Sequence, residues 1–332
     1  MPKPNNISDC ITTHTLAQKE PFLDALKRRI LLFDGAMGTE IQKLDPKPED
    51  FPDGKDGFND GLVLTHPEWI RQIHRSYLDA GADCIETNSF GSNRIKLDEY
   101  GFGNQTVEFN QEVAQLAAGV ASGYTDRPRY VIGSMGPTGY LPSSDDPDLG
   151  QKPLDEICQA FELQARGLIL GGVDALLIET SQDVLEIKLA VEACHNAAEA
   201  TKTPTPIIAN TTLDQHGKML LGTSVQAAYT TVSGMGIDIF GLNCSTGPVE
   251  MVSSVKWLDE QEHGVLVVPN AGMPENQQGR AVYRMTPDEM AGAMEDLLQE
   301  CGSIRIIGGC CGTGPGHIRA LRRLIDEEPG RS

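Results

Sequence analysis

Short runs of apolar, β-branched residues recur along the chain and alternate with longer stretches in which apolar residues return every three or four positions. The short runs are typical of buried strands, and the longer stretches are typical of helices with one apolar face. We predict strands at residues 30–33, 84–87, 130–133, 175–178, 206–209, 237–242, 265–268 and 304–307. We predict helices at residues 67–80, 104–122, 154–171, 184–200, 224–235, 248–262, 287–301 and 316–327.

Successive strand–helix units of this kind predict a single α/β domain of the (β/α)8 TIM-barrel type. An open doubly wound sheet is the alternative, but no Gly-x-Gly-x-x-Gly motif follows the first predicted strand. We expect the barrel to occupy residues 21–330, which no linker interrupts, and residues 1–20 to form a flexible tail. Polar loops at residues 45–60 and 142–153 should lie on the C-terminal face of the barrel, where such folds keep their active sites.

Composition and charge narrow the classes of partner. The 332 residues carry a formal net charge of −20, which argues against binding to nucleic acid or to an anionic membrane surface. No apolar run reaches the roughly 18 residues of a membrane-spanning helix, and the N-terminus has no signal-peptide pattern. We therefore expect a cytoplasmic protein whose thiols are reduced. The sequence makes no prediction about the oligomeric state.

Cysteines follow two of the predicted strands. Cys244 comes just after the strand at residues 237–242, and Cys310 and Cys311 come after the strand at residues 304–307. Three thiolates suit a tetrahedral zinc ion with a fourth position open to a substrate thiol. Cysteines that merely pack in the core, or a disulfide between Cys310 and Cys311, are the alternatives. Glycines on both sides of the pair favour the metal site, because they let the backbone turn and direct both thiols to one point.

Carboxylates and hydroxyls stand at the ends of other predicted strands. Asp34, Glu86 and Glu179 each come at a strand end, and Thr87 and Ser134 lie at two further positions of this kind. Each carboxylate alone could serve as a helix cap or as a salt-bridge partner. Together, the carboxylates could hold an α-ammonium group, while the hydroxyls and backbone N–H groups could hold a carboxylate. The pattern therefore predicts a binding site for an amino acid.

Six segments carry a resemblance to one protein family. They are residues 33–39 (FDGAMGT), 80–90 (AGADCIETNSF), 133–139 (GSMGPTG), 241–245 (GLNCS), 269–272 (PNAG) and 308–313 (GGCCGT). Over nearly all of residues 25–325, the chain resembles the zinc-dependent homocysteine S-methyltransferases, and most closely the homocysteine-binding module of cobalamin-dependent methionine synthase. The segments at residues 241–245 and 308–313, which carry Cys244, Cys310 and Cys311, are the most specific part of this resemblance.

The resemblance implies a (β/α)8 barrel in which Cys244, Cys310 and Cys311 hold zinc. It also implies that the sulfur of homocysteine takes the fourth position as a thiolate. Zinc binding ionises a thiol that would otherwise be mostly protonated at neutral pH. Attack of that sulfur on a donor methyl group would then give methionine.

The same resemblance implies which residues hold the substrate. Asp34 and Glu179 match family positions that contact the amino-acid end of homocysteine. Asn270 stands where its amide oxygen could fill the zinc site before substrate arrives. The predicted substrate-binding residues are Asp34, Gly35, Thr87, Ser134, Glu179 and Asn270.

Three kinds of methyl donor fit the family: a methylated corrinoid, a sulfonium such as S-methylmethionine, and glycine betaine. The chain has no Asp-x-His-x-x-Gly motif for cobalamin, so methylcobalamin would be carried by a partner protein or module. Its two tryptophans lie away from the predicted strand ends, which disfavours an aromatic cage for betaine. The match to the methionine synthase module favours the methyl-corrinoid. A non-catalytic module that binds thiols through zinc, and a different thiol as acceptor, are further alternatives.

Overall fold

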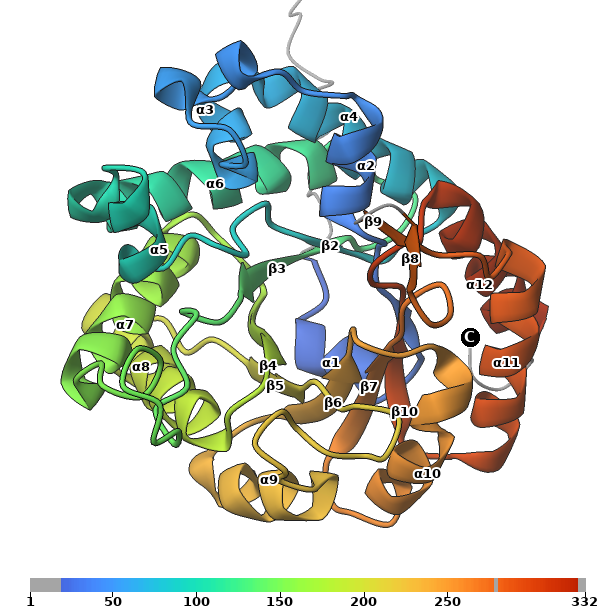
Figure 1. Cartoon of the computed structure of the whole chain (residues 1–332). Helices are drawn as coiled ribbons and strands as arrows, with labels where there is room; N and C mark the ends of the chain where they lie inside the picture. Colours follow the sequence, from blue (N-terminus) through green and yellow to red (C-terminus); the bar gives the residue numbers. More distant parts are fainter. Residues whose placement is uncertain (1–18, 278–279, 328–332) are drawn as a thin grey trace, which may run out of the picture.

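Parallel strands form a barrel in this computed structural model, which describes residues 19–277 and 280–327 (Figure 1). Hydrogen bonds join the strands in the order β1-β10-β7-β6-β5-β4-β3-β2. The strands are β1 (Leu31–Leu32), β2 (Cys84–Glu86), β3 (Tyr130–Met135), β4 (Ala175–Ser181), β5 (Ile207–Thr211), β6 (Ile239–Asn243), β7 (Gly264–Val268) and β10 (Ile304–Ile307). The predicted (β/α)8 barrel and the positions of its strands are confirmed.

Helices enclose the barrel, as Figure 1 shows. Those at the predicted positions are α4 (Pro67–Ala80), α6 (Thr106–Ala121), α7 (Leu154–Leu170), α8 (Val184–Thr201), α9 (Val225–Val232), α10 (Pro248–Asp259), α11 (Pro287–Glu300) and α12 (Pro315–Glu327). Across the described ranges, none of the helices combines the length and apolarity that a membrane crossing requires.

Several short elements are not predicted by the sequence pattern. They are α1 (Phe22–Leu26), α2 (Met37–Lys43), α3 (Leu62–Thr65), α5 (Arg94–Glu99) and a hairpin of β8 (Glu275–Gln277) and β9 (Arg280–Val282). The helices are too short to show a full apolar period. The residues of β8 are all polar and exposed, so this strand lacks the apolar alternation of a half-buried strand.

The seam between β1 and β2 is closed largely by one aspartate. The backbone N–H of Asp83 donates to the carbonyl of Leu32 at 2.7 Å, and the N–H of Leu32 donates to the Asp83 carboxylate at 3.0 Å. Arg127 and Arg322 pair with the same carboxylate at 3.0 and 3.1 Å, so its charge is balanced although it is buried. The Asp83 side chain thereby provides one of the hydrogen bonds between β1 and β2 that the two-residue strand β1 is too short to make through its backbone.

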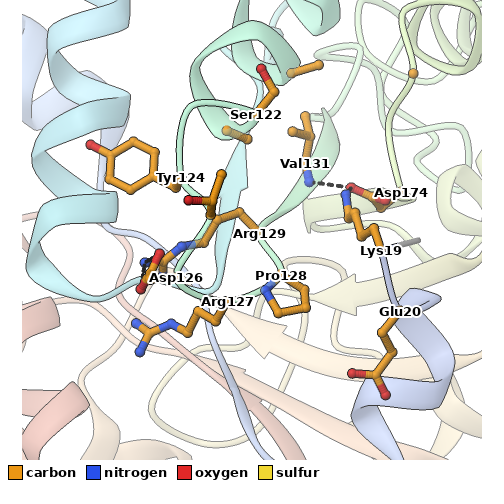
Figure 2. A pocket seen from close by; sticks show the side chains of 14 residues that line it. Lys19, Glu20, Ser122, Tyr124, Asp126, Arg127, Pro128, Arg129, Val131 and Asp174 are labelled. Atoms are coloured by element: carbon orange, nitrogen blue, oxygen red, sulfur yellow. Dashed lines mark hydrogen bonds and ion pairs between the residues drawn. The ribbon is translucent and has the colours of Figure 1, made fainter. Parts of the chain in front are cut away.

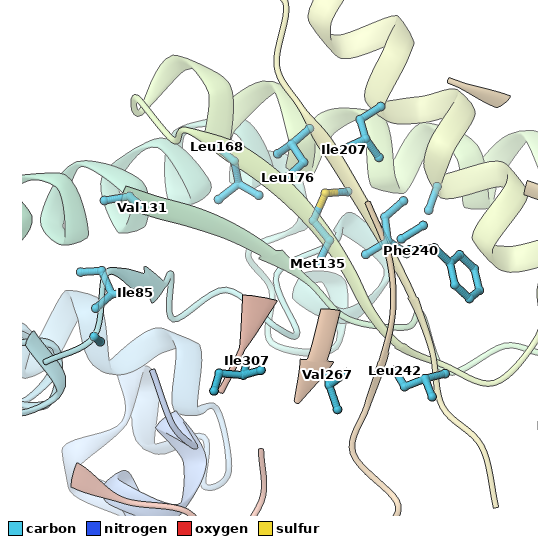
Figure 3. Close-up of a cluster of buried hydrophobic side chains, with 14 of the residues drawn as sticks. Ile85, Val131, Met135, Leu168, Leu176, Ile207, Phe240, Leu242, Val267 and Ile307 are labelled. Atoms are coloured by element: carbon cyan, nitrogen blue, oxygen red, sulfur yellow. The ribbon is translucent and has the colours of Figure 1, made fainter. Parts of the chain in front are cut away.

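The apolar core has two layers, because successive strand residues point to opposite faces of the sheet. Inside the barrel lie residues such as Tyr130, Leu177 and Ile208, and α1 inserts Phe22 against them from the N-terminal end. The Phe22 and Tyr130 rings meet edge to face, with centroids 5.5 Å apart. The outer layer lies between strands and helices, and Figure 3 shows Val131, Leu168, Leu176, Phe240 and Ile307 within it.

A cavity of about 540 Å³ opens at the start of β3, on the N-terminal side of the barrel (Figure 2). Four of its charged groups form two ion pairs with one another. Lys19 pairs with Asp174 at 2.6 Å, and Asp174 also accepts from the N–H of Val131 at 2.7 Å. Arg129 pairs with Asp126 at 2.8 Å. The predicted tail ends at this cavity: residues 1–18 lie outside the described chain, while residue 19 is held by its ion pair.

One buried side chain of the helical layer has no hydrogen-bond partner. His74 on α4 is fully buried, and neither ring nitrogen is satisfied within the described structure. Burial lowers its pKa to about 4, because an apolar environment disfavours the charged imidazole.

We predict that His74 makes the fold sensitive to acid. An unfolded histidine takes up a proton near pH 6.5, whereas the folded one stays neutral until about pH 4. Unfolding therefore gains protons as the pH falls, and His74 should lower the free energy of unfolding by about 2 kcal/mol between pH 7 and pH 5. The measurement is urea unfolding of metal-free protein at both pH values, with His74→Leu for comparison. Identical pH dependence in the two proteins would contradict a neutral, unpartnered imidazole.

Candidate metal and substrate site

Three cysteine side chains meet at the C-terminal end of the barrel. Cys244 follows β6, and Cys310 and Cys311 follow β10. Their sulfur atoms all lie within 4.8 Å of one another, and the sulfurs of Cys244 and Cys311 are 3.8 Å apart. A tetrahedral zinc site with Zn–S bonds of about 2.3 Å requires sulfurs about 3.8 Å apart. The arrangement therefore fits three ligands of a tetrahedral metal ion.

The alternatives to metal binding fit this geometry less well. All three thiols are free rather than joined in a disulfide, and all three are only half buried rather than packed in the core. Within residues 19–277 and 280–327, no other group of three histidine, cysteine or acidic side chains comes close enough together to hold a metal.

The backbone around these cysteines is unusual. Cys244 and Ser245 have φ angles of 61° and 64°, in the left-handed region that glycine usually occupies. The N–H of Cys244 donates to Val268 on the neighbouring strand at 3.1 Å, which helps to hold this conformation. Gly312 also has a positive φ of 81°, and a Cβ on Gly309 would lie 2.4 Å from the Thr313 hydroxyl. The glycines beside the cysteine pair thus permit the tight turn that the sequence predicts.

The thiols share charge unequally. Hydrogen bonds from Cys244 and Cys310 lower the pKa of Cys311 to about 3. The same contacts raise the pKa of Cys310 far above its usual range. A single negative charge is therefore easily held by the cluster, but ionising all three thiols requires a cation between them. A soft divalent metal meets that requirement.

A cavity of about 360 Å³ opens beside the cysteines. It brings together the cysteines and four of the predicted substrate-binding residues, Gly35, Thr87, Ser134 and Glu179. The other two, Asp34 and Asn270, are buried at the same end of the barrel but do not line the cavity.

Carboxyl groups crowd this cavity. Glu86 and Glu179 line it, and the adjacent Asp34 accepts a hydrogen bond from the Glu86 N–H at 3.0 Å. Burial, with mutual repulsion between the charges, raises the pKa of Asp34 and Glu86, and burial raises that of Glu179 to about 7. These groups favour a ligand that brings a positive charge.

A fourth carboxyl group, Asp60, is missing from the sequence prediction. It comes from the polar loop after β1, lines the cavity, and accepts hydrogen bonds from Gly91 and Ser92 at 2.7 Å. Burial raises its pKa to about 6. Nothing in the sequence separates Asp60 from the other acidic residues of that loop.

Two predicted substrate-binding hydroxyls already have protein partners. The Ser134 hydroxyl donates to one carboxylate oxygen of Glu179, and the amide of Asn243 donates to the other at 3.1 Å. The Thr87 hydroxyl accepts from the Ser134 N–H at 2.9 Å and shares a hydrogen bond with Ser89 at 2.6 Å. Ser134 and Asn243 therefore fix the orientation of Glu179. The role of Asn243 is another that the sequence reasoning misses, although the residue adjoins Cys244 in a matched segment.

Asn270 lies between the two cysteine loops, because it follows β7 and β7 pairs with both β6 and β10. It is buried, and its side-chain oxygen has no hydrogen-bond partner in the described structure. A buried amide oxygen is rarely left unpaired. This observation fits the predicted role of Asn270 as an oxygen ligand near the cysteines.

The β8–β9 hairpin adds a tyrosine that the sequence reasoning does not identify. Tyr283 follows β9, and burial together with the neighbouring Cys311 raises the pKa of its hydroxyl. Its side chain rests on Gly312, where an added Cβ would lie 2.3 Å from the Cβ of Tyr283. The sequence does not reveal the position of Tyr283, because the hairpin that carries it lacks the apolar alternation of a strand.

Comparisons with known proteins agree with this site. A model of the homocysteine S-methyltransferase family matches residues 31–325. Methionine synthase of Mycobacterium tuberculosis is 41% identical over 306 residues, and that of Mycobacterium leprae is 39% identical over the same length. These matches take in 91% of this chain but 25% of each relative, so the chain spans about a quarter of their length.

Solved structures support the fold. The metallated form of the homocysteine methyltransferase MmuM from Escherichia coli matches with a TM-score of 0.72 and 23% identity, over 90% of this chain and 96% of that one. Its oxidized form matches equally well, with a TM-score of 0.72 over 91% of this chain and 97% of that one.

We predict that Cys310→Ala abolishes metal retention. Loss of an outer-shell partner alone weakens metal sites by about 10- to 100-fold, so loss of a ligand should weaken zinc binding by at least about 100-fold. Zinc in purified protein would be measured by mass spectrometry. Cys158→Ala is the control, since Cys158 is a half-buried thiol outside the cluster. A normal zinc content in Cys310→Ala would refute the ligand assignment.

Proposed function

The chain belongs to the homocysteine S-methyltransferase family and is a methyltransferase, and from this premise we propose that it transfers a methyl group from a corrinoid to homocysteine, giving methionine. The observation that carries the proposal is the joint position of the cysteine cluster and the carboxyl-lined cavity. One end of that cavity suits a thiol held at a thiolate-bound metal, and its walls suit an ammonium group.

The cysteines are the proposed zinc ligands. Zinc bound there would supply an open fourth position and would lower the pKa of the substrate thiol, which is near 8.5 or above when free. Three cysteine thiolates already offset the metal charge, so a fourth sulfur remains electron-rich. The neutral thioether of methionine is a weaker ligand than a thiolate and should leave. Asn270 is proposed to fill the fourth position when no substrate is present.

The carboxylates are proposed to bind the amino-acid end of homocysteine. One carboxylate oxygen of Glu179 accepts a hydrogen bond from Ser134, and the other accepts one from Asn243. The orientation of this carboxylate is therefore fixed before substrate arrives. Asp34 is held by the Glu86 N–H. Gly35 lines the cavity, and a Cβ at this position would lie 2.8 Å from the Tyr77 ring, so only glycine lets the strand end pack this closely. In this arrangement Thr87 and Ser134 act mainly by holding the strand ends and Glu179 in place.

We predict that Glu179→Gln raises the KM for homocysteine by about 10- to 100-fold, since it removes a charged hydrogen bond to the ammonium group. Zinc content should stay unchanged. In the wild type, protonation of Glu179 below about pH 7 should raise KM, and this part of the pH dependence should vanish in the variant. Glu186→Gln is the matched control, because Glu186 is a buried carboxyl of similarly raised pKa outside the cavity. An unchanged KM would remove Glu179 from the substrate site.

The surface around the cavity supports a large donor carried by a protein. Exposed apolar side chains lie in several of the loops after the strands and at the start of one following helix, on the C-terminal face of the barrel. They include Phe90, Leu149, Leu220, Leu221, Val249 and Met273. We propose that these side chains, which share one face, contact the protein that carries the donor. Among the residues that the structure describes, Phe90 is the one aromatic residue that lines the cavity, and a single ring does not form a cage for betaine.

The donor is tested with protein whose zinc content has been measured. We expect methionine from homocysteine and methylcobalamin, and loss of this turnover on chelation. Methionine from S-methylmethionine or betaine, but not from methylcobalamin, would overturn the corrinoid proposal. Binding of homocysteine without turnover from any donor would indicate a non-catalytic module.

A surface variant separates a free donor from a protein-bound one. Leu220→Asp combined with Leu221→Asp should slow transfer from a methylated corrinoid protein at least tenfold, and leave transfer from free methylcobalamin unchanged. Leu170→Asp is the control, since this exposed leucine ends α7 on the opposite face. Equal rates for all three proteins with the corrinoid protein would exclude docking at Leu220 and Leu221.

A further inference from the structure

One histidine uses both of its ring nitrogens at the edge of the cysteine site. His317 lies in the first turn of α12, and the N–H of Gly314 donates to its Nδ1 at 3.2 Å. Nδ1 is therefore unprotonated, and the neutral ring carries its proton on Nε2. Nε2 donates to the carbonyl oxygen of Met285 at 2.9 Å. The side chain thus joins the loop that carries the cysteine pair to the segment that follows the β8–β9 hairpin.

Hydrogen bonds continue from this segment back to the cysteine pair. The N–H of Met285 donates to the carbonyl of Ala271 at 3.1 Å, and the N–H of Ala271 donates to the carbonyl of Cys311 at 2.9 Å. Cys311 and Gly314 belong to the same loop, so the contacts of His317 close these bonds into a ring. In a closed ring, the hairpin segment, the loop after β7 and the cysteine loop hold one another in place.

The loop after β7 extends this ring to the rest of the metal site. The carbonyl of Pro269 accepts from the N–H of Cys310 at 2.7 Å. The N–H of Asn270 donates at 3.0 Å to the carbonyl of Thr246, which lies in the loop that carries Cys244. Movement of the β7 loop would therefore disturb both cysteine loops.

Close packing leaves little space within the ring. A Cβ added to Gly312 would lie 2.3 Å from the Cβ of Tyr283, and one added to Gly272 would lie 3.2 Å from the Cβ of Met285. Both glycines have a φ of 81°, which other residues rarely adopt. The segment at residues 283–285 therefore packs directly on the backbones of the cysteine loop and the β7 loop, and His317 holds it there.

The contact of His317 with Gly314 has a local explanation as well. Gly314 immediately precedes α12, and a side chain in the first turn that pairs with the N–H before a helix caps that helix. Such a cap needs Nδ1 alone. The bond from Nε2 to Met285 joins residues 32 positions apart and satisfies no group of the helix. The two ring nitrogens therefore separate a local role from a role in the metal site.

We propose that His317 is a positioning residue that clamps the segment at residues 283–285 to the cysteine loop and thereby slows loss of the metal. Release of zinc requires the sulfurs of Cys310 and Cys311 to move away from that of Cys244, and the closed ring opposes this movement. Hydrogen bonds behind the ligands support metal sites in this way. The inference rests on the proposed zinc site but not on the identity of the methyl donor.

Two substitutions separate the two ring nitrogens. The amide oxygen of asparagine lies near the place of Nδ1, so His317→Asn keeps an acceptor for Gly314 and loses the bond to Met285. The amide nitrogen of glutamine lies near the place of Nε2, so His317→Gln keeps the donor to Met285. His195→Asn is the matched control, since Nε2 of His195 on α8 bonds to the carbonyl of Met235 at 2.8 Å, away from the cysteines.

The measurement is the rate at which zinc-loaded protein gives up its metal to an excess of a chromophoric chelator. We expect His317→Asn to release zinc about fivefold faster than the wild type, as the loss of one hydrogen bond implies. His317→Gln and His195→Asn should release it at the wild-type rate. An unchanged rate in His317→Asn would overturn the proposal. Equal acceleration in His317→Asn and His317→Gln would also overturn it, because the bond to Met285 would then not be the cause.

Amide hydrogen exchange in the zinc-loaded proteins tests the ring itself. The N–H groups of Ala271 and Met285 should exchange faster in His317→Asn and stay protected in His317→Gln. Equal protection in the two variants would count against the ring. If the wild-type protein binds no zinc, the proposed metal site and this inference both fail. A zinc-loaded wild type whose release rate is unaltered in His317→Asn defeats this inference alone.

Discussion

Closure of the barrel between its first and second strands is the constraint on which the site depends. β1 is so short that carboxylates complete the seam: Asp83 accepts from Leu32, and Asp34 accepts from Glu86. Two arginines balance Asp83, whereas in the described part of the chain no basic side chain pairs with Asp34. The same kind of bond therefore closes the barrel at both ends, and only at the C-terminal end does it leave a buried carboxyl group that can take a cationic ligand.

The strand ends on the far side of the cavity carry backbone strain. Thr180, Cys244 and Ser245 all have positive φ angles, and such conformations cost roughly 1–3 kcal/mol each in residues other than glycine. Asn243 offsets part of this by accepting from the N–H of Thr180 at 2.9 Å while it holds Glu179. At this rim of the barrel the strain lies in residues next to the thiols and the Glu179 carboxylate. Asp45, Asp53 and Lys202 also have positive φ angles, but they do not line the cavity.

Sequence reasoning reached the barrel and the core of the site for one reason: all strand ends of a barrel meet at one rim, so Glu179 and the cysteines had to be neighbours. It missed Asp60 and Tyr283 because both depend on the paths of irregular loops, which leave no periodic signal. For Thr87 and Ser134, the sequence pattern predicted that they lie at strand ends, but it did not predict which groups their hydroxyls would hydrogen-bond to. A hydroxyl at a rim can face the ligand or a neighbouring side chain, and only the packed structure decides between them.

The charges of the site explain why a metal ion and an amino acid would fit the same cavity. Burial raises the pKa of the carboxyl groups of Asp34, Asp60, Glu86 and Glu179, and neighbouring negative charges raise it further for Asp34, Glu86 and Glu179. The site therefore does not hold all its negative charges without a cation. A divalent metal at the cysteines and an ammonium group at the carboxylates would each relieve part of this repulsion. Each cation therefore increases the negative charge available to the other, which couples metal binding and substrate binding favourably. The formal net charge of −20 adds to the negative electrostatic potential outside the cavity.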